Sequence, residues 1–254
     1  MQQRRVFGKF IHRYEVLDST NLEAWRLCRQ NRGAEGTMVL AQYQTHGRGQ
    51  ANTHWESEAG KNLCVSAILE PLFLPPDRQF QLNKVISLAV RDAVRQMLPG
   101  HQVPIKWPND IYVGTKKIAG ILIENAIMGD RLSQSIAGIG ININQRNFDP
   151  SLPNPVSIAR ITGRDAHPGI CLDYLCAALD KWYGLLKSSR EAELDRHYLD
   201  ALLGLGERRR FLAGGEEILA SIFGVDRHGK LVLHFDHGQE KAFDMKEISF
   251  IIGE

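Results

Sequence analysis

The segment IKWPNDIYVGTKKIAGILIEN, residues 105–125, constrains the fold of this chain more than any other. Its long apolar run indicates a buried β-strand over residues 117–125. Pro108 has no N–H to donate to a sheet ladder, so regular pairing of the strand before it ends there. Gly114 turns the chain between a short strand at 110–113 and the apolar one. The segment therefore predicts a hairpin in a sheet, with charged side chains gathered at one end of it.

Helices and further strands are expected on both sides of this hairpin. Residues 78–98 carry apolar side chains at helical spacing, and Pro99-Gly100 ends that helix. A short strand and then a helix are expected over RYEVLDSTNLEAWRL, with Asp18 or Ser19 as its N-cap and with Leu22, Trp25 and Leu27 facing inward. The other expected elements are strands at 37–43, 62–69, 103–107 and 135–142, a proline-rich connection at 148–157, and two helices over about 169–203.

The composition changes after Leu205. From there the chain holds five short strand-like pieces separated by turns at Gly214-Gly215, His228-Gly229 and His237-Gly238. Five short strands in about 50 residues suggest a small barrel. We therefore expect two domains, residues 1–204 and 205–254.

Composition excludes little beyond membrane and strongly charged classes. The net charge is +2, which gives no case for nucleic acid or an anionic membrane as a partner. No apolar run reaches the ~18 residues that span a bilayer, and the basic N-terminus lacks the apolar core of a signal peptide. The cysteines have no CxxC spacing, which favours reduced, buried thiols and a cytoplasmic protein. They are Cys28, Cys64, Cys171 and Cys176.

The hairpin segment sets two cations and a carboxylate near a glycine. Lys106, Asp110 and Lys117 surround the turn, and Gly120 interrupts the apolar strand. A glycine inside a strand often marks close approach of a ligand, and a nearby carboxylate can hold Mg²⁺. The pattern suggests a phosphate or carboxylate site. Each piece also has a plain structural interpretation, as turn chemistry or as a solvated hairpin flank.

Two other glycine-rich stretches are candidates for ligand binding. The polar loop of residues 45–61 contains GRGQ, in which the arginine offers a planar fork to an anion, although a plain flexible loop is an equal alternative. In AGIGININ, residues 137–144, Gly138 and Gly140 share one face and leave room for a flat ligand, with Asn142 pointing the same way. A close helix–sheet contact would also explain those glycines.

Taken together, these motifs resemble those of biotin protein ligases. STN at 19–21, the GRG loop, KWPND, KKIAGILIE and the GxGxN strand occur in that family's order and approximate spacing, over nearly the whole chain. The resemblance implies an α+β fold: a mixed-sheet catalytic domain of the biotin/lipoate ligase type with a small C-terminal SH3-like β-barrel. It also implies a short form without the family's N-terminal helix-turn-helix.

The activity that the resemblance implies is a two-step ligation. Biotin is activated with ATP and Mg²⁺ to biotinyl-5′-AMP with release of pyrophosphate, and biotin is then transferred to a lysine of a biotin carboxyl carrier domain, usually that of acetyl-CoA carboxylase. A tightly bound prosthetic group, a nucleic-acid partner and a membrane partner are not expected, and the chain is expected as a monomer or weak homodimer. Two alternatives are a lipoate–protein ligase and a biotin-binding protein with weak adenylation.

The resemblance also implies roles for individual residues. Lys117 would lie between the biotin carboxylate and the phosphate, with Lys106 and Arg48 as further catalytic cations and Asp110 at the nucleotide and its Mg²⁺. Biotin-binding residues would be Ser19, Thr20, Asn21, Gln44, Arg48, Gly49, Gln50, Lys117, Gly120, Gly138 and Gly140. ATP-binding residues would be Trp55, Asn109, Asn142 and Lys61.

One departure from the family pattern concerns the polar loop. Many members have GRGRxGRKW, whereas this chain has GRGQANTHW, with Gln50, Thr53 and His54 at positions where cations are common. The loop therefore carries fewer positive charges for the nucleotide. Lys61, at the far end of the loop, is the candidate to replace them.

Overall fold

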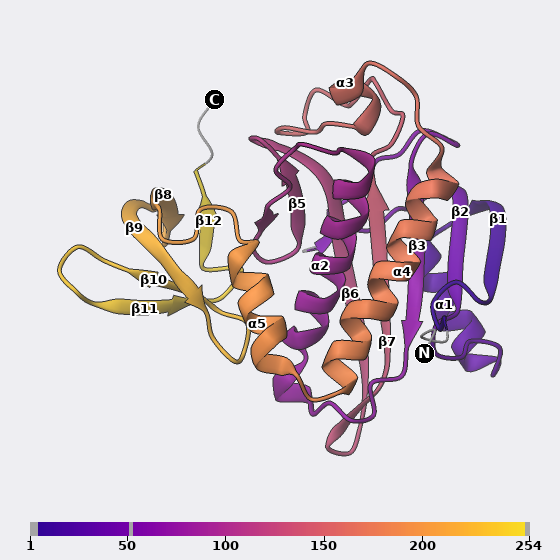
Figure 1. The fold of residues 1–254 in the computed structure, drawn as a ribbon, viewed down its shortest axis with the longest axis horizontal. Helices are drawn as coiled ribbons and strands as arrows, with labels where there is room; N and C mark the ends of the chain where they lie inside the picture. Colours follow the sequence, from indigo (N-terminus) through magenta and orange to yellow (C-terminus); the bar gives the residue numbers. More distant parts are fainter. Residues whose placement is uncertain (1–4, 51–52, 252–254) are drawn as a thin grey trace.

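A computed structural model describes residues 5–50 and 53–251, so Ala51 and Asn52 of the polar loop and the last residue of the final expected strand lie outside the described residues (Figure 1). In chain order the elements are β1 Ile11–Leu17, α1 Thr20–Arg29, β2 Met38–Gln44, β3 Leu63–Leu69, η2 Pro76–Arg78, α2 Phe80–Met97, β4 Ile105–Lys106, β5 Asp110–Val113, β6 Lys116–Met128, β7 Arg131–Ile141, α3 Ile158–Thr162, α4 Pro168–Lys187, α5 Glu191–Asp200, β8 Arg208–Ala213, β9 Glu216–Val225, β10 Leu231–His234, β11 Glu240–Phe243 and β12 Ile248–Phe250.

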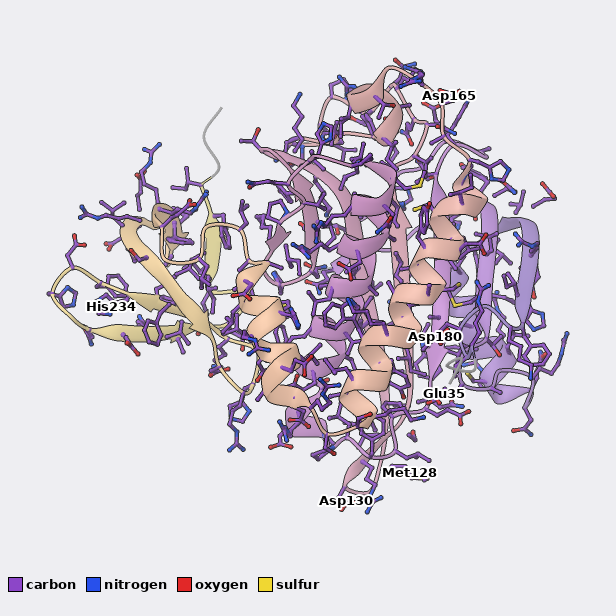
Figure 2. All side chains as sticks on the ribbon, in the orientation of Figure 1. Glu35, Met128, Asp130, Asp165, Asp180 and His234 are labelled. Carbon is purple, nitrogen blue, oxygen red and sulfur yellow. The ribbon has the colours of Figure 1, made fainter. Side chains whose placement is uncertain are left out.

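The larger sheet is mixed, as expected. Its strand order is β1-β2-β3-β7-β6-β5-β4, in which β1 and β2 are parallel and every other pair is antiparallel. The β6–β7 hairpin is its longest ribbon and turns at Gly129, whose φ of 63° suits glycine. Figure 2 shows Met128 and Asp130 at the tip of this hairpin, away from the rest of the sheet.

Helices cover both faces of this sheet. Helices α2, α4 and α5 lie on one face, where the main core contains Met38, Leu40 and Ala137 (Figure 1). Helix α1 packs on the other face, where a smaller apolar cluster contains Val39 and Ile136. Since neighbouring residues of a strand point to opposite faces, the two cores alternate along β2 and β7. The larger core thus stabilises one face, and the other face, beside α1, is left for a site.

The last five strands form an antiparallel sheet of order β11-β10-β9-β8-β12, consistent with the SH3-like expectation. It lies beside α5 and β5, at one side of the molecule (Figure 1). The joint is specific: Trp107 Nε1 donates to the carbonyl of Gly229, 2.9 Å away, and Phe80 packs against the same glycine. The residue that follows Lys106 therefore ties the two parts together.

Helix α1 differs in part from its expected orientation. Leu27 is fully buried, as expected, but Leu22 and Trp25 are only half-buried, whereas Thr20 and Asn21 are buried. The physical reason is that the first turn of this helix covers polar groups rather than an apolar core. All four cysteines are buried free thiols, as expected. Within residues 5–50 and 53–251, no helix has the length and apolar character needed to cross a membrane.

Candidate active site

A cavity of about 270 Å³ lies between the N-terminal turn of α1, the polar loop and the face formed by β6 and β7. It brings together residues that are far apart in the sequence, and every residue expected to bind biotin lines it. These residues are Ser19, Thr20, Asn21, Gln44, Arg48, Gly49, Gln50, Lys117, Gly120, Gly138 and Gly140.

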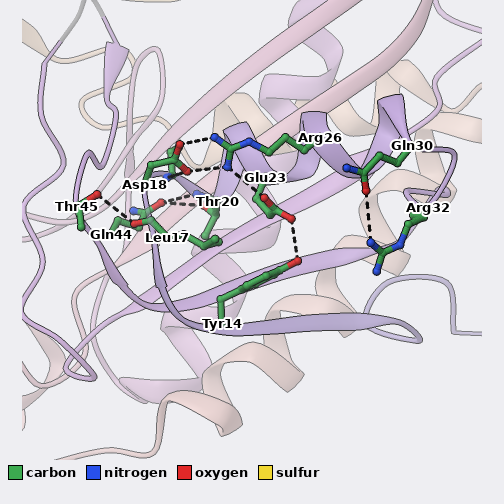
Figure 3. Close-up of polar contacts among 11 residues, drawn as sticks. Tyr14, Leu17, Asp18, Thr20, Glu23, Arg26, Gln30, Arg32, Gln44 and Thr45 are labelled. Carbon is green, nitrogen blue, oxygen red and sulfur yellow. Dashed lines mark hydrogen bonds and ion pairs between the residues drawn. The ribbon is translucent and has the colours of Figure 1, made fainter.

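Neutral hydrogen-bonding groups line the end of this cavity beside α1. The backbone N–H and hydroxyl of Thr20 lie 2.8 and 3.0 Å from Gln44 Oε1, a contact that Figure 3 shows. Ser66 Oγ lies 2.8 Å from Thr20 Oγ1 and 2.6 Å from Asn21 Oδ1. These groups hold one another in place, so this end suits a neutral polar ligand group better than an ion.

Glycines form the floor of the cavity. Gly120 of β6 and Gly140 of β7 are direct cross-strand neighbours, and the Trp55 indole lies over both. A Cβ at Gly140 would stand 2.2 Å from that indole, and one at Gly138 would stand 2.3 Å from Asn21 Oδ1. The expected space above these two glycines is therefore taken by Trp55 and Asn21, and only glycine permits that contact.

A second cavity of about 320 Å³ adjoins the first. The proline-rich connection forms part of its wall and contributes apolar side chains. The buried Asn142, just after β7, forms another part, and its Oδ1 has no hydrogen-bond partner among the described residues. The lining residues are Thr53, His54, Trp55, Glu56, Lys106, Asp110, Tyr112, Lys117, Asn142, Phe148, Leu152, Pro153, Asn154 and Pro155.

Lys117 and Asp110 belong to both cavities. The Lys117 ammonium lies 2.7 Å from Asp110 Oδ1 and 5.9 Å from the centroid of the Trp55 ring. The two residues come from neighbouring strands, because β5 and β6 form the hairpin that the sequence predicts. A cation and a carboxylate therefore stand where ligands in the two cavities would meet.

Lys106 lies in the second cavity beside this pair. Burial lowers the pKa of its ammonium; Asp110 opposes that shift and Lys117 adds to it. The ammonium lies 5.9 Å from the ring centroid of Tyr112 and 5.0 Å from that of Phe250, a residue of the C-terminal sheet. The second cavity thus holds a desolvated cation that would gain from a bound anion.

The polar loop is folded back over the first cavity. Gly49 N–H donates to the carbonyl of Thr53 at 2.7 Å, and Trp55 N–H donates to the carbonyl of Gly47 at 3.0 Å. Arg48 forms an ion pair with Glu124 of β6, with 3.0 Å between Nη1 and Oε1. The two hydrogen bonds hold the loop in its own turn, and the ion pair connects it to the sheet.

The expected ATP-binding residues do not all lie together. Asn142 lines the second cavity and Trp55 lines both, but Asn109 lines only the first, with its amide donating to the carbonyl of Ile121 at 2.6 Å. Lys61 lines neither cavity. Its side chain is exposed, and its backbone carbonyl accepts a hydrogen bond from the N–H of Asn144.

Sequence reasoning missed two parts of the site. One is the apolar wall from the proline-rich connection, which was expected only as a linker. The other is Glu124, which holds Arg48 and Asn21. Period-two spacing from Gly120 puts Glu124 on the same face of β6, and that signal would have identified it.

No group of three or more histidine, cysteine, aspartate or glutamate side chains that could hold a metal occurs in the described ranges. A single carboxylate at a nucleotide site is still a fitting donor for Mg²⁺, because Mg²⁺ is commonly held by one or two carboxylates together with substrate phosphates. Asp110, which lines both cavities, is the carboxylate that could serve as this donor if a phosphate binds beside it.

The chain is similar in sequence and in fold to known proteins. Residues 14–142 match the biotin/lipoate A/B protein ligase family. The chain is 32% identical over 228 residues to the biotin–[acetyl-CoA-carboxylase] ligase of Paracoccus denitrificans, covering 88% of this chain and 93% of that protein.

Two solved structures extend the likeness to the whole described fold. The biotin protein ligase of Aquifex aeolicus, in complex with biotin and ATP, is 28% identical with a TM-score of 0.78, covering 96% of this chain and 100% of that chain. The biotin protein ligase of Leishmania major, in complex with biotinyl-5-AMP, is 26% identical with a TM-score of 0.63, covering 93% of this chain and 99% of that chain.

Proposed function

The chain belongs to the biotin/lipoate A/B protein ligase family, and on that premise we propose its activity. It is an ATP-dependent biotin protein ligase. It activates biotin to biotinyl-5′-AMP with release of pyrophosphate, and then transfers the biotinyl group to a lysine of a biotin carboxyl carrier domain. The curated relative and the solved structures with biotin, ATP and biotinyl-5-AMP favour this activity over lipoate ligation.

The observation that carries the proposal is the pair of adjoining cavities with Lys117 and Asp110 between them. The first cavity, with its neutral donors and acceptors, suits the urea ring of biotin. The second, with apolar walls and the unpartnered Asn142 Oδ1, suits adenine, whose exocyclic amine can donate to it. An adenylate would span both cavities, and its new bond would form beside Lys117.

The chemistry needs fixed positive charge rather than a protein nucleophile. The carboxylate oxygen of biotin attacks the α-phosphorus of ATP, a new P–O bond forms, and the bond to pyrophosphate breaks. Negative charge develops around that phosphorus, and Lys117, already oriented by Asp110, is placed to stabilise it. Lys106 would contribute from the second cavity, where a phosphate would compensate the cost of its burial.

In the second step the amine of the carrier lysine attacks the biotinyl carbonyl carbon. An amide bond forms, the bond from that carbon to the phosphate oxygen breaks, AMP leaves, and the proton that the amine loses passes to solvent. Lys117 and Lys106 would stabilise the departing phosphate as in the first step. Mg²⁺, held by Asp110 with the substrate phosphates, would supply further charge neutralisation.

Three further parts of the proposal concern the setting of the reaction. The carrier belongs to acetyl-CoA carboxylase or a related carboxylase, by analogy with the Paracoccus relative. ATP as a co-substrate and the free thiols suggest the cytoplasm. Residues 1–204 form the catalytic domain and residues 205–254 an SH3-like domain, supported by the two separate sheets.

An ATP–pyrophosphate exchange assay tests the proposal. With biotin and MgATP we expect exchange, and with lipoate in place of biotin we expect little. Exchange with lipoate but not with biotin would overturn the biotin assignment. Biotin binding without exchange would identify a biotin-binding protein instead.

A further inference from the structure

We propose that Glu124 is a positioning residue for biotin: its carboxylate ties the polar loop to helix α1 and fixes the groups that surround the first cavity. The inference rests on the proposed function, because it assumes that this cavity binds biotin. Glu124 does not line the cavity itself. It acts through its two partners, Arg48 and Asn21.

Each carboxylate oxygen has its own partner. Oε1 pairs with Nη1 of Arg48 at 3.0 Å, and Oε2 accepts from Nδ2 of Asn21 at 2.8 Å. The three residues come from β6, the polar loop and α1, which are separate in the sequence. One side chain thus connects the three segments that enclose the first cavity.

The contact with Asn21 also determines which way its amide faces. With Nδ2 directed at the carboxylate, Oδ1 faces Ser66 Oγ at 2.6 Å, and Ser66 in turn lies 2.8 Å from Thr20 Oγ1. A carboxylate can only accept, so Glu124 excludes the flipped amide. The Leu122 carbonyl is a second, longer acceptor for the same Nδ2, at 3.4 Å, so Glu124 supplies the shorter of the two contacts that orient the Asn21 amide.

The contact with Arg48 holds the loop. The Glu124 side chain is 25% exposed and that of Arg48 44% exposed, so solvent weakens the pair but does not remove it. Gly49 and Trp55 continue the same loop over the cavity. Loss of the pair should loosen the loop from the sheet and leave the distant core unchanged.

The test compares Glu124→Ala and Glu124→Gln with a matched pair, Glu35→Ala and Glu35→Gln. Glu35 is 21% exposed and also binds one cation and one neutral donor, Lys187 at 2.7 Å and Tyr183 at 2.8 Å. It lies away from both cavities, beside α4 (Figure 2). The Glu35 variants therefore measure the effect of losing a half-buried acid that has similar partners but lies away from the cavities.

We expect Glu124→Ala to weaken biotin binding about tenfold, as loss of charge-assisted hydrogen bonds at a half-exposed site implies. The KM for ATP should rise less than the affinity for biotin falls, because neither partner lines the second cavity and the loop reaches that cavity only through its far residues, such as Trp55. Glu124→Gln retains one acceptor and should lie between. Trypsin should cut faster after Arg48 in Glu124→Ala, and the Glu35 variants should match wild type in all three measurements.

The outcomes separate this inference from the proposed function. If wild type shows no biotin-dependent exchange, the proposed function fails. If wild type is active and Glu124→Ala binds biotin normally, the positioning role alone is wrong. Equal losses for biotin and ATP, with a melting temperature lowered as in Glu35→Ala, would also overturn it. Should Glu124→Ala not fold, Glu124→Gln decides in the same assays.

Discussion

Lys117 Nζ of β6 lies 2.7 Å from Asp110 Oδ1 of β5, and both residues line both cavities. The β5–β6 hairpin makes this contact a property of the sheet rather than of a loop. Groups held by a sheet need little reorganisation when charge develops beside them, which is what electrostatic catalysis requires.

The first expected outcome concerns Lys117→Ala. Loss of this fixed cation should slow adenylate formation roughly 10²-fold or more, while the protein stays folded. Single-turnover formation of biotinyl-AMP measures it. Lys116→Ala, on the exposed neighbouring position of the same strand, is the control and should behave like wild type. A Lys117→Ala rate within a few-fold of wild type would remove the lysine from the mechanism.

The second concerns the glycine floor. In Gly140→Ala the new methyl group would stand 2.2 Å from the Trp55 indole, so the indole must shift into a cavity. We expect a changed tryptophan emission spectrum and a raised KM for biotin or ATP. Gly224→Ala, where the nearest side-chain atom lies 3.6 Å away, is the matched strand control. Unchanged KM values in Gly140→Ala would show that Trp55 has room to move without consequence.

The strands of both sheets could be predicted from the sequence because their apolar runs and glycine turns are local signals. The inward face of α1 could be predicted only in part. Leu27 is fully buried as expected, whereas Leu22 and Trp25 are half-buried, and the first turn buries Thr20 and Asn21 against polar neighbours. A rule that assumes an apolar core fails where a helix covers a ligand cavity.

The candidate site, too, could be predicted from the sequence only in part. The residues expected at biotin lie together, because their motifs sit on elements whose pairing the sequence indicates. The wall from the proline-rich connection, with Phe148 and Pro155, depends on how a loop returns to β7, and no local pattern states that. The backbone of Lys61 likewise has a partner that is distant in the sequence, the N–H of Asn144, which no local pattern indicates.

The third expected outcome concerns the joint between the two sheets. Trp107→Phe removes the donor to the buried Gly229 carbonyl and leaves that group unpartnered. The free energy of unfolding should fall by about 1–3 kcal/mol. Urea denaturation measures it, with Trp25→Phe as the control, because α1, which contains Trp25, lies on the opposite side of the molecule from the C-terminal sheet (Figure 1). An unchanged midpoint would mean that the joint contributes nothing to stability.

The fourth concerns pH. Hydrogen bonding to Arg26, with Nη1–Oδ1 of 3.0 Å and Nη2–Oδ2 of 2.5 Å, lowers the pKa of the Asp18 carboxyl against the opposing effect of burial (Figure 3). A depressed folded-state pKa adds stability above the unfolded pKa of about 3.9, and that stability disappears as pH falls through the folded value. Asp18→Asn should therefore be less stable than wild type at pH 7, and the two proteins should converge in acid. A difference in unfolding free energy that stays constant from pH 7 into acid would contradict the ion-pair account.

The last expected outcome concerns the charges missing from the polar loop. Gln50 and Thr53 line the first cavity, whereas Lys61 lines neither and has an exposed side chain. The described structure therefore gives no support to Lys61 as the replacing cation. Lys61→Ala should accordingly leave adenylate formation unchanged. Gln50→Arg, in contrast, adds a planar donor on the cavity wall, where it can bind a phosphate oxygen.

We expect Gln50→Arg to raise the rate of pyrophosphate release several-fold, as one added charge-assisted hydrogen bond to the reacting phosphate implies. Gln50→Met, of similar length and without charge, separates the effect of charge from that of size. Steady-state pyrophosphate release from these two variants and Lys61→Ala decides the matter. If Lys61→Ala releases pyrophosphate slowly and Gln50→Arg releases it at the wild-type rate, this expectation is wrong. Lys61 would then supply the missing charge, which requires the loop to close further once nucleotide is bound.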